Sequence, residues 1–393
     1  MINIFLFLAA TFLLTLLIGR LLEKIRVPWI FSALLIGSVL AIYNPFDSIT
    51  SSPAFYFLSQ LGMYFLLFII GFEIDFTKLK KSGKFIFKAT FFIIFLEGIF
   101  GTLLIYFVFG YSWFISALVA LSFATVGEAI LIPILDEFKI INTKLGQSII
   151  GIGTLDDVIE LSLLILVSIL IGSKVNLVSN IFLTLFSLLV LVILTVSLTK
   201  LRRKGKEFNF FSIETLFLFV LFVLFLFLGI GELANAASVA ALLAGISLNA
   251  FIPNNRIEKI KSGLKMLCYG FFAPVFFLSV GMTMDIHYLF SFPLLVLLVV
   301  VVSNSTKLLG SWIIGRKELG TKQSVLLGIG LSVRFSTSII IIKILFDNQL
   351  IGADLYSVIV ASSIAFKFIV PVLFSNLIVR WKIAKIKNGT RNR

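Results

Sequence analysis

Two adjacent carboxylates, Asp156 and Asp157, interrupt a segment of the sequence that is otherwise almost entirely apolar. The surrounding run, residues 147–171, is long enough for a membrane-spanning helix and places the pair near its middle. Ionised carboxylates are costly at that depth and adjacent like charges oppose each other, so the pair should titrate as one coupled unit. Carboxylate oxygens also bind hard cations. Such a pair favours a site that releases a proton and takes up a small cation.

The sequence leaves open the roles of two further acids in predicted spans, Glu160 and Glu128. Glu160 follows Asp156 by one helical turn and shares its face of the helix. It either contacts the cation or forms a structural ion pair with Arg334 or Lys367. Glu128, in a polar patch of its span, is either a cation ligand or the partner of Arg334.

Four basic residues, Lys307, Arg334, Lys343 and Lys367, also lie within predicted spans. A fifth, Lys88, lies near the cytoplasmic end of its span, from which its side chain can reach the surface. A charge at the bilayer centre costs about 2.5–3.5 kcal/mol on insertion scales, so such residues need an ionic partner or a water-filled cavity. The acids could therefore serve only to neutralise these bases. We favour a functional site, because ionisable residues inside a membrane are functional by default.

The composition predicts a membrane protein. Hydrophobic residues make up 60% of the 393 residues and charged residues 13%, with a mean hydropathy of +1.13, whereas soluble domains are about a quarter charged. The single cysteine, Cys268, excludes an intrachain disulfide, and the single histidine, His287, makes a multi-histidine metal site implausible.

The apolar runs divide into thirteen predicted spans of membrane-helix length. Basic residues gather in the loops after spans 1, 3, 5, 7, 9 and 11 and in the tail after span 13, whereas the other loops hold only Lys174. Positive loops stay cytoplasmic. We therefore expect a multi-pass protein of a prokaryotic plasma (inner) membrane, with its N-terminus outside and its C-terminus inside. The spans are 2–19, 27–43, 54–74, 86–109, 113–135, 147–171, 177–199, 211–230, 233–251, 266–284, 291–314, 323–346 and 354–379.

Two pairs of similar segments indicate an internal repeat. Ser32–Ser38 resembles Ala240–Ser247, and Leu66–Asp75 resembles Val275–Asp285, at nearly the same offset. The two members of each pair lie seven spans apart. Because seven is odd, the second copy crosses the membrane in the direction opposite to the first. Inverted repeats are typical of secondary transporters, which bind substrate near the midplane beside interrupted helices. We predict two six-helix inverted repeats, a linker helix over 177–199, and interruptions in spans 5 and 12, where polar patches break the apolar runs.

Several features together resemble a known family: the Asp156-Asp157 pair, Lys307 in span 11, "FFAPVFFLSVGMTMD" in span 10 and "LLFIIGFEIDFTKLK" in span 3. They are similar to the monovalent cation:proton antiporter superfamily, and within it to the CPA2-type sodium/proton exchangers, over essentially the whole chain. The resemblance implies an all-α polytopic membrane protein. Its implied parts are a dimerisation scaffold (1–84 and 211–290), an ion-carrying core (85–171 and 291–380), the linker helix (177–199) and a short basic cytoplasmic tail (381–393).

The resemblance also implies roles for individual residues. Asp157 is the main cation and proton carboxylate, and Thr125 lies where the interrupted span 5 approaches the ion. Asp156 pairs with Lys307, and this pair opens when the cation binds. The Asp-Asp form implies electrogenic exchange.

The sequence departs from the family pattern at two basic residues. Arg334 is followed by Phe335 and Ser336 where the family often has Gly and Glu, so Arg334 needs another acid, Glu128 or Glu160. Lys367 occupies a position that is usually uncharged. By the repeat offset Lys367 is the counterpart of Asp157, and Glu97 stands opposite Lys307.

We therefore expect an antiporter, not an enzyme, that exchanges a monovalent cation, Na+ first, for protons by alternating access. Its expected partners are the cation, the proton, the lipid bilayer and a second copy of the chain in a homodimer, without nucleic acid. We expect no cofactor besides the transported Na+, Li+ or K+ and H+. The alternatives are a K+/H+ antiporter and a cation channel on the same scaffold. An intramembrane aspartyl protease is discounted, because its two acids must stand on different helices.

Replacing Lys367 by Met tests whether this extra base acts in exchange. Near the carboxylates the lysine should stay charged and compete with the cation. Lys367→Met should therefore keep the fold but change cation affinity or the charge moved per cycle, measured as current on a solid-supported membrane. A melting temperature recorded on the same preparation separates the alternative, a structural ion pair, which predicts a destabilised protein with wild-type affinity and charge movement.

Overall fold

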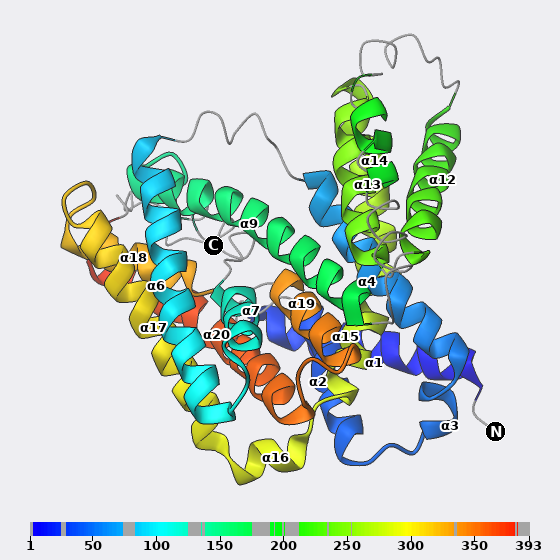
Figure 1. The fold of residues 1–393 in the computed structure, drawn as a ribbon, viewed down its shortest axis with the longest axis horizontal. Coiled ribbons are helices and arrows are strands. Elements are labelled where there is room, and N and C mark those ends of the chain that lie inside the picture. Colours follow the sequence, from blue (N-terminus) through cyan, green and yellow to red (C-terminus); the bar gives the residue numbers. More distant parts are fainter. Residues whose placement is uncertain are drawn as a thin grey trace, which may run out of the picture. The chain divides into compact units, whose positions relative to one another are not determined.

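Every regular element in the described part of this computed structural model is a helix (Figure 1). The structure describes residues 3–24, 29–73, 83–124, 135, 138–174, 189–191, 193–198, 200, 212–233, 236–252, 254–333, 336–381 and 383. The longer helices are α1 (Ile4–Lys24), α2 (Phe31–Ile42), α4 (Pro53–Glu73), α6 (Lys84–Phe109), α7 (Trp113–Ala124), α9 (Lys144–Lys174), α12 (Ile213–Glu232), α13 (Ala237–Phe251), α14 (Asn254–Leu267), α15 (Ala273–Met282), α17 (Pro293–Gly315), α18 (Thr321–Leu331), α19 (Ser336–Asp347) and α20 (Ala353–Arg380). Two short helices are α3 (Asp47–Thr50) and α16 (Ile286–Ser291), and a π-helical turn, Cys268–Phe272, joins α14 to α15.

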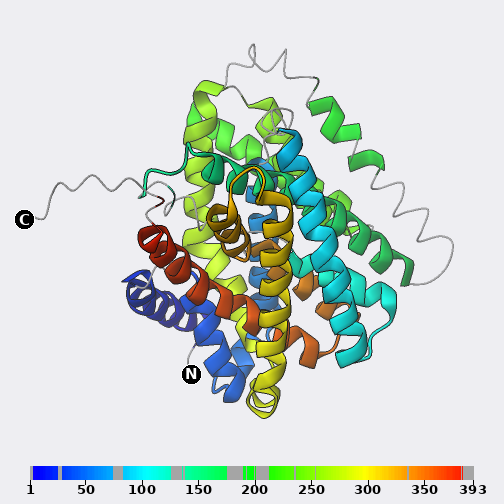
Figure 2. The same ribbon diagram turned by 90° about the vertical axis from the view of Figure 1, so that its left-hand side faces the viewer.

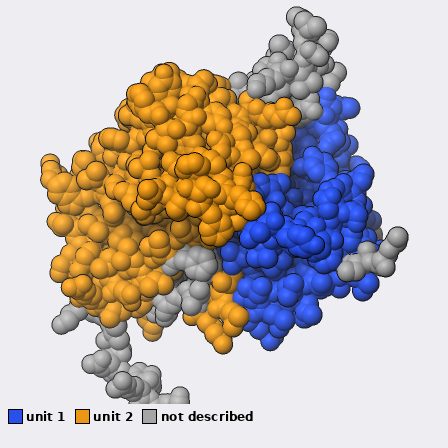
Figure 3. All heavy atoms as spheres, turned by 90° about the horizontal axis from the view of Figure 1, so that it is seen from below, with its two compact units in different colours: residues 1–20, 29–74, 161–284 blue, residues 21–28, 75–160, 285–393 orange. Residues whose placement is uncertain are grey.

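The chain folds into two compact units, coloured separately in Figure 3. Unit 1 comprises residues 1–20, 29–74 and 161–284, and unit 2 comprises residues 21–28, 75–160 and 285–393. Each unit therefore gathers segments that are far apart in the sequence. The dimerisation and ion-carrying roles expected for two parts of the chain are not tested by this division and stay predictions.

Seven helices of the described residues are long and apolar enough to cross a membrane. Large apolar side chains such as Phe95, Leu218 and Leu294 lie exposed on them, as a lipid-facing surface requires. Helix α9, with 31 residues, is longer than any of the seven and differs from them by its three carboxylates. The predicted polytopic membrane protein is confirmed. The count of thirteen spans stays a prediction, because most of span 177–199 lies outside the described residues. The seven segments are Ile4–Lys24, Pro53–Glu73, Lys84–Phe109, Ile213–Glu232, Arg256–Met282, Pro293–Gly315 and Ala353–Arg380.

Among the described helices of unit 1, α2 crosses α15 and α4 crosses α13 with glycine bringing the backbones into contact. A Cβ built at Gly37 of α2 would lie 2.1 Å from a carbonyl oxygen of α15, and one at Gly281 of α15 would lie 2.2 Å from a carbonyl oxygen of α2. Helices α4 and α13 cross in the same way at Gly71 and Gly245, with distances of 2.1 and 2.2 Å. Backbone atoms cannot move aside as a side chain can. Only glycine therefore permits these approaches without displacing a helix.

In the described part of unit 2, helices α6, α9, α17, α18 and α20 contribute to an apolar core. The core includes Ile93 of α6, Ile152 of α9, Val300 of α17, Leu327 of α18 and Val370 of α20. Helices α6 and α17 lie side by side along much of their length (Figures 1 and 2). Burial of such side chains is worth about 1.5–3 kcal/mol each, so this core fixes the relative positions of the helices that carry the charged residues.

The predicted interruption of span 12 is confirmed. Helix α18 ends at Leu331, and α19 begins at Ser336. A continuous helix would have satisfied its own backbone groups, whereas the break leaves carbonyl oxygens at the end of α18 without helical partners. In span 5, helix α7 ends at Ala124, and the polar patch that follows lies outside the described residues.

The crossing of α4 and α13 should be intolerant of even one added methyl group. We expect Gly245→Ala to lower the free energy of unfolding by about 1–3 kcal/mol, the usual range for overpacking, because its Cβ would meet backbone atoms of α4. The control is Gly229→Ala in α12, where a Cβ has nothing within 4 Å. Thermal unfolding in detergent should show a loss for Gly245→Ala alone, and equal melting temperatures would contradict the close approach.

Candidate functional site

A buried ion pair lies within unit 2, between the middles of α6 and α17. Lys307 and Glu97 are 0% and 1% exposed, and Lys307 Nζ lies 3.4 Å from Glu97 Oε2. Ser303, one turn before Lys307, donates a hydrogen bond from Oγ to Glu97 Oε1. A buried charge is tolerated only when it is paired and hydrogen-bonded. The two helices are therefore joined at mid-length by a charge-assisted contact.

The ammonium of Lys307 has a further partner at the break in span 12. Its Nζ donates a hydrogen bond of 2.8 Å to the carbonyl oxygen of Leu331, the last residue of α18. The C-terminal carbonyls of a helix carry partial negative charge, which a cation stabilises. Gly328 permits the approach, since a Cβ there would lie 2.8 Å from the Cα of Leu308 on α17. One lysine thus links α17, α6 and the interrupted end of α18.

Asp156 lies on the core-facing side of α9. Its side chain is 0% exposed, and it follows the core residue Ile152 by four positions, which keeps both on one helix face. Glu97 and Lys307 likewise follow the core residues of α6 and α17 by four and seven positions. Three ionisable side chains are therefore buried on helices that share one apolar core. This arrangement can hold charges of both signs away from water.

A comparison with protein families decides the class of protein to which this site belongs. The family model described as "Sodium/hydrogen exchanger, transmembrane" matches residues 10–380. The chain belongs to the sodium/hydrogen exchanger family. The expected resemblance to cation:proton antiporters is thus confirmed, and the family comprises transporters rather than enzymes.

Two relatives within the exchanger family match this chain over most of its length. The probable Na(+)/H(+) antiporter 3 of Methanocaldococcus jannaschii is 27% identical over 380 residues, which cover 95% of this chain and 96% of the relative. The Na(+)/H(+) antiporter of Enterococcus hirae is 24% identical over 330 residues, which cover 80% and 82% of the two chains.

A solved structure of an exchanger has the same fold. The sodium proton antiporter MjNhaP1 of Methanocaldococcus jannaschii, determined at pH 8, matches with a TM-score of 0.68 and covers 94% of this chain and 98% of its own. Its sequence identity is 16%, so the likeness concerns the fold alone. The all-helical antiporter fold is confirmed by this match.

The structure locates the expected site residues of this exchanger unevenly. Asp156 and Lys307 are described with their side chains, and both are buried. Glu97 is a partner of Lys307, and the pairing of Lys307 with Asp156 stays a prediction. Only the helix backbone is described for Asp157, Glu160 and Lys367. Thr125, Glu128 and Arg334 lie outside the described residues.

Sequence reasoning assigned no role to Glu97 or Ser303, although both contact the site. The repeat offset placed Glu97 opposite Lys307, and a carboxylate in the middle of an apolar span was a further signal. Ser303 carried no signal of its own, because isolated serines are common in membrane helices and bond readily to their own backbone.

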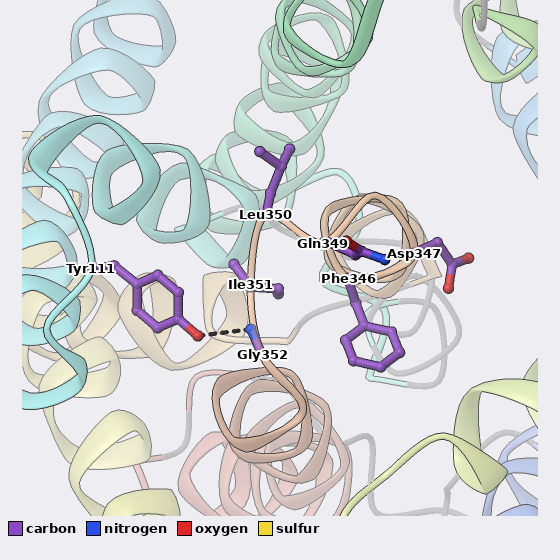
Figure 4. A pocket seen from close by; sticks show the side chains of 7 residues that line it. All are labelled: Tyr111, Phe346, Asp347, Gln349, Leu350, Ile351 and Gly352. Carbon is purple, nitrogen blue, oxygen red and sulfur yellow. Dashed lines mark hydrogen bonds between the residues drawn. The ribbon is translucent and has the colours of Figure 1, made fainter. Parts of the chain in front are cut away.

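A second polar cluster lines a cavity of about 540 Å³ beside the start of α20 (Figure 4). The Tyr111 hydroxyl accepts a hydrogen bond of 2.7 Å from the Gly352 N–H and donates one of 3.4 Å to Asp354. Burial, with the nearby Asp354 carboxylate adding to it, raises the pKa of Tyr111, so the hydroxyl stays protonated. Asp347 pairs with Lys343. Since both acids are engaged, we assign this cluster a structural role in fastening the start of α20.

The Lys307–Glu97 pair predicts a non-additive effect on stability. Lys307→Met should lower the free energy of unfolding by about 3–5 kcal/mol, because it leaves a buried carboxylate without its cation. Adding Glu97→Gln to that variant removes the uncompensated charge and should restore part of the loss. Thermal unfolding of the two single variants and the double variant measures this coupling, and a double variant less stable than either single one would contradict it.

Proposed function

We propose that this chain exchanges a monovalent cation, Na+ in the first place, for protons by alternating access. One observation carries the proposal: in a member of the exchanger family, Asp156 is buried on a helix of span length, within a core that also holds the buried Lys307–Glu97 pair. Ionisable groups are not retained inside a membrane for packing alone. They are suited to bind a charge on one side and release it on the other.

The proposed chemistry is competition at a carboxylate. A carboxylate that binds either a proton or a cation, but not both, couples the two fluxes without any covalent step. We assign the principal role to Asp157. Asp156 is proposed to pair with Lys307 and to leave it when the cation binds, with Thr125 supplying an oxygen near the ion. Oxygen ligands of this kind suit a hard monovalent cation.

Three remaining charged residues receive proposed supporting roles. Arg334, which in the sequence falls between the segments of α18 and α19, requires an acid, for which Glu128 and Glu160 are the candidates. Lys367 on α20 is proposed to compete with the cation for a carboxylate. Each follows from sequence position and from the cost of an unpaired charge in the membrane.

We further propose the inverted six-helix repeats within thirteen spans. The repeat relates α2 to α13 and α4 to α15. The crossings at Gly37/Gly281 and Gly71/Gly245 support it, since exchanging the related helices turns the first crossing into the second. The basic loops support an N-terminus outside and a C-terminus inside.

The proposal includes a homodimer formed through the scaffold part, residues 1–84 and 211–290, with the core part, 85–171 and 291–380, carrying the ion. The chain would act in the plasma membrane of a prokaryote, with electrogenic stoichiometry and without a resident cofactor. These assignments rest on the resemblance to the family.

Potassium is the second candidate for the cation. The glutathione-regulated potassium-efflux system protein KefC of Escherichia coli is 25% identical over 299 residues, which cover 73% of this chain and 47% of that protein. Na+, Li+ and K+ require similar oxygen ligands, so the transported ion has to be measured.

Proteoliposomes with an internal pH dye test the exchange directly. After acid loading, external Na+, Li+ or K+ should alkalinise the lumen, and the rate should saturate with cation concentration. A rate that stays linear with concentration and needs no opposing proton gradient would instead support a channel. Folded protein that responds to none of the three cations would contradict the proposal.

Asparagine substitutions at Asp156 and Asp157 should affect exchange differently. Asp157→Asn should abolish exchange, since an amide neither releases a proton nor supplies a full negative charge. Asp156→Asn should leave some exchange but alter its pH dependence and lower the melting temperature, because Lys307 loses a proposed partner. Both are measured in the same proteoliposomes and by thermal unfolding. Equal and complete loss in both variants would show that the roles are divided wrongly.

A further inference from the structure

Glu97 contributes a buried carboxylate from a helix other than the one that carries Asp156. It is 1% exposed, lies 3.4 Å from the Lys307 ammonium, and accepts a hydrogen bond from Ser303. Its helix, α6, is anchored in the apolar core by Ile93, one turn earlier. The carboxylate is thus held in place by packing and by a hydroxyl donor on the helix that carries the lysine.

Lys307 is therefore stabilised by groups that do not belong to α9. Glu97 supplies a full negative charge, and the carbonyl oxygen of Leu331 supplies the partial charge of a helix end at 2.8 Å. An ammonium with these two partners still has negative neighbours when it separates from an aspartate. It can leave one anion without becoming an isolated charge, which would be strongly unfavourable.

We propose that Glu97 is a positioning residue for cation uptake: it retains the Lys307 ammonium when Asp156 releases it, and so frees Asp156 and Asp157 for the cation. This inference rests on the proposed exchange and on the proposed Asp156–Lys307 pair. The transported cation and the Lys307 ammonium compete for Asp156. Glu97 attracts the ammonium and so reduces its affinity for Asp156. Glu97 itself does not touch the cation.

The consequence is a change in apparent affinity rather than in turnover. Without Glu97, Lys307 has fewer negative partners and holds Asp156 more firmly. A higher cation concentration is then needed to open the pair. A merely structural Glu97 would instead affect the amount of folded protein and its melting temperature, while each folded molecule would bind the cation as before.

The test compares cation-dependent exchange in proteoliposomes of wild type and Glu97→Gln, normalised to folded protein. The KM for the cation should rise by about tenfold, which corresponds to about 1.4 kcal/mol, while the maximal rate changes by less than about twofold. An unchanged or lowered KM, with or without a lower melting temperature, would overturn the inference. Absence of exchange in the wild type would count against the proposed function instead.

Two further variants make the result independent of folding yield. Thr90→Val, also on α6, removes a buried hydroxyl that bonds to the carbonyl oxygen of Ile86, and it should destabilise the protein without changing KM. Glu97→Asp keeps the charge on a shorter side chain and should raise KM by about threefold through the longer charge separation. If Glu97→Gln does not fold, Glu97→Asp decides: a wild-type KM overturns the inference, and a raised KM supports it.

Discussion

A charge buried in a membrane helix must be matched by other charges, and in unit 2 this requirement is met at Lys307. Its ammonium forms an ion pair with Glu97 of α6 and donates a hydrogen bond to the carbonyl oxygen of Leu331 at the end of α18. One lysine side chain of α17 therefore links three helices. Because such a pair loses its stability when one partner is removed, the positions of α6, α17 and α18 depend on one another. The Lys307 ammonium also stabilises the interruption between α18 and α19, because it bonds to a carbonyl oxygen that has no partner within the helix. The proposed exchange uses this same lysine.

Each of these buried charged side chains is held in position by apolar packing on its own helix face. Ile93, Ile152 and Val300 anchor the faces of α6, α9 and α17 on which Glu97, Asp156 and Lys307 lie. Gly328 lets α18 come close enough for the lysine to reach Leu331. In unit 1, glycine pairs serve a different purpose, because they lock α2 against α15 and α4 against α13 with backbone in contact. Rigid elements of this kind are what a moving ion site requires, since alternating access is largely a rigid-body motion of one bundle against another.

Much of this organisation could be predicted from the sequence, because its causes are local. Hydropathy predicted a polytopic helical protein, and the polar patch around Ser332 predicted the interruption of span 12. The segments around Asp156-Asp157 and Lys307 indicated the exchanger family. The partnership of Lys307 with Glu97 was harder to foresee, because the repeat offset gives the depth of a residue but not the rotation of its helix about its axis. Rotation is set by the core packing of α6 and α17, which no single segment encodes. Ser303 and the Leu331 carbonyl could be identified only from the folded chain, since their roles arise from contacts between helices.

If a proton and a cation compete for Asp156 and Asp157, cation binding must release protons, and this release can be measured. Purified protein in a weakly buffered detergent solution, with a pH indicator, would receive Na+, Li+ or K+ at a pH where the carboxylates are partly protonated. We expect the transported cation to displace protons into solution with a saturating dependence on its concentration, and Asp157→Asn to abolish the release. Cation binding that displaces no protons, with binding verified calorimetrically on the same sample, would show that the two ions do not compete for these carboxylates.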